Sequence, residues 1–365
     1  MTDHVLLTGA TGFLGGRMAA ELLDRTSATV HCLVRGRPGP GPARRLHDHV
    51  TSIARRPVEP GRLVALRGDL REPLLGLSAD AYDRLAETTD ALYHCGASVN
   101  LAAGDDRLAL TNVSGTRTIL HLAGHRRPKP VHHVSSLGIF TNARACDQPD
   151  VDETTLPRSE FTGPTGYTRT KYQAELLTRD AAADVTLYRP GVIVADSRTG
   201  ACAETDLLVR VVRAAIALGV APDSDGDIPV GPVDEVARGL IALSLEPGHT
   251  GRAFHLIDPE HLRFDDVFEH LRAFGYPLRR CTPAEWKEVL STNLARPEAL
   301  VVLALWDSVE RLLATEPHYR VPRVDSRATH AELARIGATP STTTGPELLD
   351  RMLRHLIDRR IIPAP

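Results

Sequence analysis

The sequence of 365 residues predicts an α/β fold, in which a doubly wound parallel sheet is joined to a smaller, mainly helical C-terminal part. Two observations support this prediction. Short apolar segments alternate with helix-like segments up to about residue 195, and a glycine-rich turn connects the first apolar segment to the first helical one. The expected strands are 5–7, 30–34, 63–66, 91–94, 131–134 and 186–188.

The glycine-rich turn lies directly behind the first expected strand and opens a helical pattern that reaches Leu23. Gly9 can adopt the angles of a tight turn, Gly12 lets the main chain approach a pyrophosphate, and Gly15 lets helix and strand pack closely. The alternative is a purely structural turn. We expect a Rossmann-type dinucleotide site whose pyrophosphate lies at the helix N-terminus. Its expected contacts are Thr8, Gly9, Thr11, Gly12, Phe13, Leu14 and Gly15.

Arg35 directly follows the second expected strand. An acidic residue in this region would bind the ribose 2′-hydroxyl of NAD, whereas an arginine accommodates the 2′-phosphate of NADP. The sequence therefore predicts NADPH as the cofactor. Arg45, with its neighbour Arg44, is a second candidate contact for that phosphate, and an ordinary solvated start of a helix is the alternative.

Tyr167 and Lys171 are four residues apart in a helical pattern, so their side chains share one helix face. Such a pair alone is typical of a surface helix. The serine pair Ser135-Ser136, which ends the expected strand at 131–134, changes this interpretation. Serine, tyrosine and lysine beside a nucleotide turn are the groups of a hydride-transfer site, and we expect Ser136, Tyr167 and Lys171 to be catalytic.

With these motifs in place, the chain resembles the extended short-chain dehydrogenase/reductase superfamily. Cys95 departs from the family pattern, because many members have asparagine there, but it alters no proton-transfer group. The resemblance implies that Tyr167 and Lys171 also touch the cofactor. The other positions that match the family and are implied to border the cofactor are Asp69, Leu70, Gly96, Ala97, Asn112, Pro190, Gly191 and Val192.

Within that superfamily the chain is similar to thioester reductases, the terminal reductase domains of carboxylic acid reductases and of peptide and polyketide synthetases. The matching segments run from Leu33-Val34-Arg35 to the tail after Val324, so the likeness covers nearly the whole chain. It implies NADPH-dependent reduction of an acyl or peptidyl thioester to an aldehyde, without an enzyme nucleophile. Whether reduction continues to an alcohol stays open.

The implied chemistry places the substrate carbonyl near Ser136 and Tyr167, whose hydroxyls would meet the developing oxyanion. Tyr167 would then donate the proton, and Lys171 would hold the nicotinamide ribose. At about 4 Å and an effective dielectric of about 20, the ammonium of Lys171 would favour the phenolate by roughly 4 kcal/mol, before desolvation opposes it. We therefore expect a lowered pKa for Tyr167.

The domain organisation follows from where the strand and helix alternation stops. We expect residues 1–195 and about 228–258 to form the Rossmann domain, and about 196–227 and 259–365 to form a substrate-binding cap. The loop from 141 to 166 should border the substrate. Apolar helix faces in the expected cap are interpreted as its core rather than as substrate contacts: Trp286, Leu290, Leu303, Trp306, Val309 and Leu313. For Leu207, Leu208, Val211 and Val212 both interpretations stay open, and the resemblance implies that their region lies over the acyl site.

Composition excludes several functions. The net charge of −3 and the 4% aromatic content give no nucleic-acid footprint, and no apolar run approaches membrane-spanning length. The five cysteines are scattered and odd in number, so we expect reduced thiols in a cytoplasmic protein. The 16 histidines show no metal-binding spacing, so no metal is expected. Alternation in the pair His132-His133 predicts that one of the two rings points inward, as a core histidine.

The thioester donor would be a phosphopantetheinylated carrier protein or acyl-CoA. Because the first strand begins close to Met1, we expect a discrete protein that acts in trans. Basic clusters at Arg279-Arg280 and at Arg210 with Arg213 are candidate docks for an acidic carrier, or ordinary solvated faces. Two other functions stay open: an extended reductase or epimerase that acts on a free carbonyl or nucleotide sugar, and a non-catalytic NADP-sensing protein.

Overall fold

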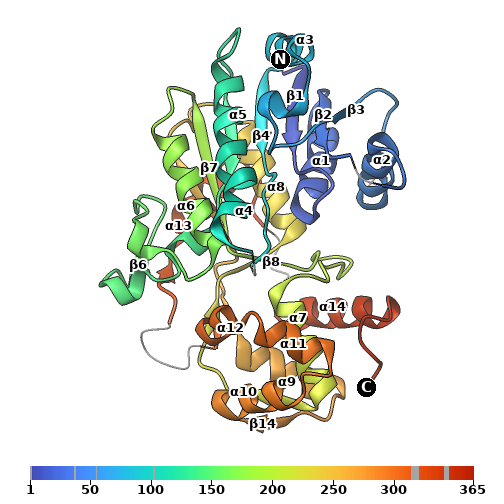
Figure 1. Cartoon of the computed structure of the whole chain (residues 1–365), viewed down its shortest axis with the longest axis vertical. Coiled ribbons are helices and arrows are strands. Elements are labelled where there is room, and N and C mark those ends of the chain that lie inside the picture. Colours follow the sequence, from blue (N-terminus) through green and yellow to red (C-terminus); the bar gives the residue numbers. More distant parts are fainter. Residues whose placement is uncertain (1, 37, 55, 102, 314–319, 341–344) are drawn as a thin grey trace.

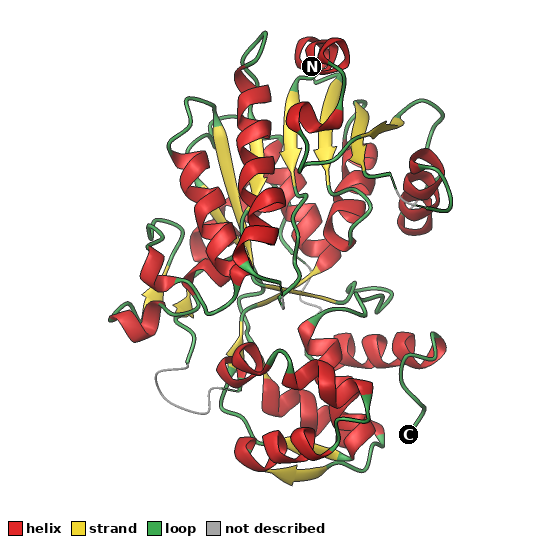
Figure 2. Ribbon diagram, in the orientation of Figure 1, coloured by secondary structure: helices red, strands yellow, loops and turns green. Residues whose placement is uncertain are grey.

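A computed structural model describes residues 2–36, 38–54, 56–101, 103–313, 320–340 and 345–365. Two bodies lie end to end along the longest axis (Figure 1). The first carries the large sheet with helices on both faces, and the second is mainly helical (Figure 2). None of the helices within the described ranges is long and apolar enough to cross a membrane.

The large sheet has seven strands in the order β12-β7-β5-β4-β1-β2-β3, and every neighbouring pair is parallel. The six strands expected from the sequence are confirmed. Because β1 lies between β2 and β4, the strand order reverses beside β1, and a ligand crevice is expected at the carboxyl ends there. The strands are β1 His4–Thr8, β2 Thr29–Val34, β3 Leu63–Arg67, β4 Ala91–His94, β5 Val131–Val134, β7 Val185–Pro190 and β12 Ala253–Leu256.

Helices bury both faces of this sheet. Val5 and Leu7 of β1 belong to one apolar core, whereas Leu6 belongs to the core on the opposite face, as strand alternation requires. The first face is covered by α1 Phe13–Arg25, α2 Pro42–Ile53 and α8 Val233–Ser244. The second is covered by α3 Ala79–Thr88, α5 Gly115–Gly124 and α6 Gly166–Arg179. The short helix α4 Asp105–Ala109 leads through a π-helical turn, Leu110–Ser114, into α5.

The second body has its own apolar core. The rings of Trp286 and Trp306 lie 6.2 Å apart there, and the other apolar residues expected in the cap core are buried in it or packed against it. Its helices are α7 Leu207–Leu218, α9 Phe264–Phe274, α10 Pro283–Thr292, α11 Pro297–Leu303, α12 Trp306–Leu312 and α14 Pro346–Asp358. Short strand pairs complete the chain: β8 Val192–Val194 with β11 Val230–Pro232, β9 Val220–Pro222 with β14 Arg279–Cys281, and β10 Asp227–Ile228 with β13 Leu262–Arg263.

One segment differs from the expected division of the chain. The strand β15 Arg323–Val324 pairs with β6 Asp150–Val151, and the helix α13 Arg327–Arg335 that follows packs against α8 and β12. Leu333 is buried in the Rossmann core rather than in the cap core. The assignment of all of 259–365 to the cap therefore fails for this segment, because an amphipathic pattern shows that a face is buried and not which body buries it.

Candidate active site

The glycine-rich turn packs tightly against its own backbone and against the end of β4. Gly9 has a φ of +82°, and a Cβ on it would lie 2.8 Å from the backbone nitrogen of Gly96. A Cβ on Gly15 would lie 2.1 Å from the carbonyl oxygen of Gly9. Gly12 caps α1 without any side-chain hydrogen bond to the first turn. The first backbone amides of the helix are thus available to an anion, which fits a dinucleotide pyrophosphate.

Three arginines gather at the ends of β2 and β3. Arg35 follows β2, Val34 is in register with Arg67 of β3, and a Cβ on Gly36 would lie 3.2 Å from Nε of Arg67. Arg45 donates from Nη2 to the carbonyl oxygen of Arg35. Its Nη1 is buried and has no hydrogen-bond partner in the part of the chain that the structure describes. An orphaned donor beside Arg35 fits an anionic group of the ligand.

The structure separates Arg44 from this cluster and adds Arg67 to it. Arg44, the neighbour of Arg45, has a side chain that is 78% exposed and lies 3.5 Å from Asp48 on the same helix. It therefore belongs to the solvated face of α2. Arg67 was not among the residues expected from the sequence. It could have been predicted, because it ends the strand next to β2 and parallel strands end at the same edge of a sheet.

The residues after β3 and β4 form the next part of the crevice. The carboxylate of Asp69 accepts from Arg71 at 2.7 Å, and this hydrogen bond lowers the pKa of Asp69. Leu70 is buried, and its side chain lies against Gly96, where a Cβ would come within 2.8 Å of it. The amide of Gly96 donates to Oγ1 of Thr8 at 2.9 Å, which ties the end of β4 to the end of β1. Ala97 follows at the same edge.

Asn112 is buried within the π-helical turn before α5. Its Oδ1 accepts from the amide of Ser98 at 2.7 Å, and its Nδ2 donates to the carbonyl oxygen of Ser98 at 3.1 Å. Nδ2 also lies 3.0 Å from Oγ1 of Thr170, which is on α6 next to Lys171. The side chain of Asn112 therefore holds the loop after β4 against the helix that carries Tyr167 and Lys171.

His94 continues this network, although no role was predicted for it. Its Nε2 lies 3.0 Å from the hydroxyl of Thr116, which itself donates to the carbonyl oxygen of Asn112. Nε2 must then carry the proton, and Nδ1 accepts from Thr8 at 2.8 Å. Burial lowers the pKa of His94 to about 3, so the ring is neutral and acts as a fixed connector.

Ser136, Tyr167 and Lys171 meet where β5 ends beside α6. The hydroxyl oxygen of Ser136 accepts from the amide of Gly138 at 3.0 Å and also interacts with the hydroxyl of Tyr167. Lys171 is buried, and its Nζ donates to the carbonyl oxygen of Val134 at 2.5 Å. Thr165 caps α6 by accepting from the amide of Thr168, so the helix begins just before Tyr167.

The protonation behaviour of Tyr167 is opposite to the expected one. Burial raises the pKa of Tyr167 to about 12, and the hydrogen bond to Ser136 offsets only part of this rise. Burial also lowers the pKa of Lys171 to about 8, which weakens its ability to stabilise a phenolate. The expectation of a lowered pKa for Tyr167 is therefore wrong, because desolvation is the largest effect on it. The phenol is protonated at neutral pH, as a proton donor must be.

The segment Pro190-Gly191-Val192 follows at the carboxyl end of β7. Pro190 ends β7, and Val192 begins β8. A Cβ on Gly191 would lie 2.1 Å from the carbonyl oxygen of Pro229, so glycine is required for the chain to cross here. These three residues stand at the same carboxyl edge as Gly96 and Ser136.

Other polar candidates have structural surroundings. Both histidines of the pair on β5 are buried, contrary to the alternation argument, because helices cover both faces of the sheet. His132 bonds the hydroxyl of Tyr188 at 3.1 Å, whereas neither nitrogen of His133 has a partner among the described residues. No group of three metal-ligating side chains occurs in the described ranges. All five cysteines are free thiols.

The basic clusters considered as docks are compensated at one arginine each. Arg280 lies within 2.7 Å of both Asp223 and Glu269 and within 3.6 Å of Asp265. In the second cluster, Arg213 pairs with Glu298 at 3.1 Å. The other two arginines, Arg279 and Arg210, donate to backbone carbonyl oxygens instead.

Comparisons with known proteins agree with this arrangement. A family model described as "Male sterility protein", of an NAD-binding family, matches residues 7–240. The chain is 37% identical to a linear gramicidin synthase of Brevibacillus parabrevis over 292 residues, and 35% identical to an isonitrile lipopeptide synthase of Streptomyces coeruleorubidus over 380 residues. These matches cover 79% and 100% of this chain, but only 6% and 25% of the two synthases.

Solved structures give a match at the scale of one domain. The terminal R domain from the myxalamid PKS-NRPS biosynthetic pathway superimposes with a TM-score of 0.91 at 34% identity, and the match covers 100% of this chain and 93% of that one. A thiolation-reductase di-domain from an archaeal non-ribosomal peptide synthetase shares the fold, with a TM-score of 0.81 at 22% identity over 99% of this chain and 76% of that one.

Proposed function

Because the chain belongs to the NAD-binding male sterility protein family and, within it, to the terminal reductase domains of peptide and polyketide synthetases, we propose that it reduces an acyl or peptidyl thioester to an aldehyde. The observation that carries the proposal is the meeting of the hydroxyls of Ser136 and Tyr167 beside buried Lys171, at the sheet edge that also bears the glycine turn. Two neutral hydroxyl donors at one point suit a carbonyl oxygen that gains negative charge.

Each of the three residues has a distinct task in the proposed reaction. Ser136 and Tyr167 donate hydrogen bonds to the thioester oxygen, and Tyr167 then transfers its proton to it. A bound reduced nicotinamide supplies the hydride to the carbonyl carbon. Lys171, whose Nζ donates to the carbonyl oxygen of Val134, would use its remaining N–H groups to hold the cofactor ribose. The resulting thiohemiacetal collapses to aldehyde and free thiol, so no covalent bond to the protein forms.

The thiols of the chain support a mechanism without an enzyme nucleophile. Burial raises the pKa of Cys95 and of Cys202 to about 12, so both are protonated at neutral pH. Cys95 lies beside Lys171, and even there the ammonium offsets only part of the effect of burial. A nucleophilic cysteine would need the opposite shift.

The proposed cofactor is NADPH, and the proposed contacts follow the crevice from β2 to β7. Arg35, Arg45 and Arg67 would bind the 2′-phosphate, and the glycine turn would bind the pyrophosphate. Asp69 and Leu70 would border the adenine end, whereas Asn112 would hold the loop beside the nicotinamide end. The orphaned Nη1 of Arg45 is the observation that favours a phosphate over a hydroxyl at this corner.

The proposed thioester donor is a phosphopantetheinylated carrier protein, with acyl-CoA as the alternative source of the same thioester. The similarity to synthase segments supports a carrier, since the curated relatives are several times longer than this chain. Arg280 and Arg213 are paired with acidic residues, so these two contribute little to docking of an acidic carrier. Comparison of one acyl group on CoA, on pantetheine and on a carrier separates these donors.

One experiment tests the proposed function. The purified chain is mixed with NADPH and matched acyl-CoA, acyl-pantetheine, free aldehyde or nucleotide sugar, and the products are identified by mass spectrometry. We expect thioester-dependent NADPH oxidation with release of an aldehyde, or of an alcohol if two NADPH are used for each thioester. Turnover of the sugar or of the free aldehyde, but never of the thioester, would instead indicate an epimerase or an ordinary carbonyl reductase.

A further inference from the structure

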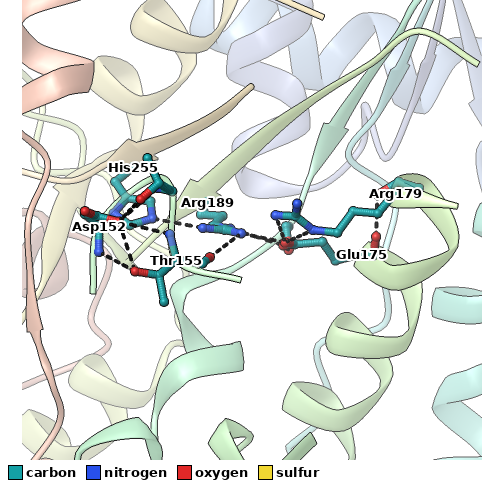
Figure 3. A network of polar contacts seen from close by, with 9 residues as sticks. Asp152, Thr155, Glu175, Arg179, Arg189 and His255 are labelled. Atoms are coloured by element: carbon teal, nitrogen blue, oxygen red, sulfur yellow. Dashed lines mark hydrogen bonds and ion pairs between the residues drawn. The ribbon is translucent and has the colours of Figure 1, made fainter. Parts of the chain in front are cut away.

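A buried carboxylate lies one helical turn beyond Lys171 and is not needed by the chemistry above. Glu175 is fully buried on α6. Its oxygens accept from the hydroxyl of Ser135 at 2.6 Å, from Nη2 of Arg189 at 2.7 Å and from Nη2 of Arg179 at 3.0 Å. Figure 3 shows Glu175 between the two arginines, with Arg189 extending toward Thr155 and His255. A buried charge costs stability unless it is fully compensated, and these hydrogen bonds compensate the charge of Glu175. The presence of a buried carboxylate at this position therefore calls for an explanation.

Ser135 connects this carboxylate to the active site. It is the residue immediately before Ser136, and it is buried with its hydroxyl toward Glu175, so only Ser136 faces Tyr167. The amide of Ser135 also donates to the carbonyl oxygen of Tyr188 at 2.7 Å. Both the main chain and the side chain of Ser135 are thus held, which fixes the start of the turn that presents Ser136.

Two ties join α6 to the end of β5. Nζ of Lys171 donates to the carbonyl oxygen of Val134, and the residue that follows this strand, Ser135, donates its hydroxyl to Glu175. Lys171 and Glu175 are one turn apart on the helix face that meets the strand. These ties set the distance and the rotation between the helix that carries Tyr167 and the turn that carries Ser136.

Arg189 supports the same turn from its other side. The guanidinium of this fully buried residue lies 4.9 Å from the ring centroid of Phe140, which ends the short helix Leu137–Phe140 directly after Ser136. It also donates to His255 at 3.2 Å and to the carbonyl oxygen of Thr155 at 3.4 Å. His255 in turn bonds the carbonyl oxygen of Asp325 at 2.8 Å.

We propose that Glu175, held by Arg189, is a positioning residue that fixes Ser136 relative to Tyr167 and Lys171 through the hydroxyl of Ser135. The inference rests on the proposed function, since it assigns a role within that reductive site. Its alternative is an ion pair that stabilises the fold without affecting the geometry of catalysis.

The charge of Glu175 gives the inference a second observable consequence. The titratable groups that face Lys171 are Tyr167 and Glu175 on α6, Cys95 and His94 around the end of β4, and His133 on β5. Of these groups, Glu175 is the one that carries a charge at neutral pH. Its carboxylate raises the pKa of Lys171, against the larger effect of burial that brings it to about 8.

The main test compares two serines in the same chemical setting. Ser135→Ala removes the tie to Glu175, and Ser197→Ala is the control, because Ser197 is also buried and donates to a buried carboxylate, Asp234, at 2.6 Å. We expect Ser135→Ala to lower kcat about 10- to 100-fold with less than about a twofold change in the KM for NADPH, as a misplaced catalytic group would. We expect Ser197→Ala to retain kcat. Equal kcat values for both variants would overturn the inference.

The second test measures how kcat/KM depends on pH in Glu175→Gln. Loss of the carboxylate should lower the pKa of Lys171, so the decline at high pH should move from about 8 to lower pH. A decline that stays in place, in a variant that folds, would indicate a structural ion pair and refute the inference.

A third readout needs no turnover. Amide hydrogen exchange over residues 135–141, measured by mass spectrometry, should become faster in Ser135→Ala than in the wild-type protein or in Ser197→Ala. Unchanged exchange there would contradict the positioning role. If the wild-type protein reduces no thioester, the proposed function fails, while this readout still decides whether Glu175 fixes the turn.

Discussion

Tyr167 is the residue on which the proposed chemistry depends most. It has the only hydroxyl assigned to proton donation, and its raised pKa of about 12 keeps it protonated through the working range. We expect Tyr167→Phe to lower kcat about 10³-fold, because a general acid contributes about 10²- to 10⁴-fold, while the melting temperature and NADPH binding stay close to wild type. Steady-state kinetics, calorimetry and cofactor titration measure these quantities.

The matched control for this prediction is Tyr172→Phe. Tyr172 lies on the same helix, half-buried against a separate apolar cluster, and has no assigned role in the reaction. Loss of the Tyr172 hydroxyl should leave kcat within about twofold of wild type. Full reductase activity in Tyr167→Phe would remove Tyr167 from the role of proton donor.

Arg35 is the residue that we propose to select NADPH over NADH. A charge-assisted contact to the 2′-phosphate is worth about 1.5 to 3 kcal/mol, so Arg35→Ala should weaken NADPH binding about 10- to 100-fold and leave NADH binding nearly unchanged. Titration of the protein with each cofactor measures the ratio. Arg44→Ala is the control, because its exposed side chain lies near Asp48 and should not alter the preference. An equal loss for both cofactors in Arg35→Ala would show that Arg35 does not recognise the phosphate.

Among the elements, the turn between β1 and α1 has little steric freedom at Gly15. An alanine at position 15 would place its Cβ 2.1 Å from the carbonyl oxygen of Gly9, so the turn and the helix must move apart. We expect Gly15→Ala to lower the free energy of unfolding by about 1 to 3 kcal/mol and to abolish most NADPH binding. Urea unfolding and cofactor titration test both effects.

Gly124 is the corresponding control at the end of α5. A Cβ there meets nothing within 4 Å, and its φ is not positive. Gly124→Ala should therefore leave NADPH binding intact and stabilise the protein by up to about 1 kcal/mol, because alanine loses less conformational freedom than glycine in a helix. A variant Gly15→Ala that behaved like Gly124→Ala would refute the steric account of the turn.

The buried histidines make the stability of the whole molecule sensitive to low pH. Burial lowers the pKa of His94 to about 3 and of His132 to about 4, and it lowers that of His133 well below its ordinary value. Below about pH 6.5 the unfolded chain binds protons that the folded chain does not, so stability decreases as the pH falls. Asp206, whose pKa burial raises to about 6, acts in the opposite direction, but it is a single group.

We therefore expect the free energy of unfolding to fall between pH 7 and pH 5.5 by about 1 kcal/mol for each such histidine, since one pKa unit corresponds to about 1.4 kcal/mol. Urea unfolding at both pH values measures the decrease. His132→Gln should make the decrease smaller by about 1 kcal/mol, whatever its effect on stability at pH 7. A decrease that is unchanged in His132→Gln would contradict the assignment.

The sequence by itself determined the sheet and the outline of the site. Strand alternation and the spacing of Gly9, Gly12 and Gly15 are local patterns, and backbone conformation follows from neighbouring residues. The same holds for Tyr167 and Lys171, because a spacing of four fixes a shared helix face. The six expected strands and the resemblance to terminal reductase domains are confirmed for this reason.

The tertiary structure alone decided which groups are buried together. The sequence predicted Ser136 as the catalytic serine but gave no partner for Ser135, whose hydroxyl donates to Glu175, 40 residues away. Arg67 joins Arg35 because β3 lies beside β2, and α13 returns to the Rossmann core through contacts with α8 and β12. Burial also reversed the expected change in the pKa of Tyr167. Desolvation and long-range contacts depend on the packed three-dimensional arrangement, and no local pattern of residues encodes them.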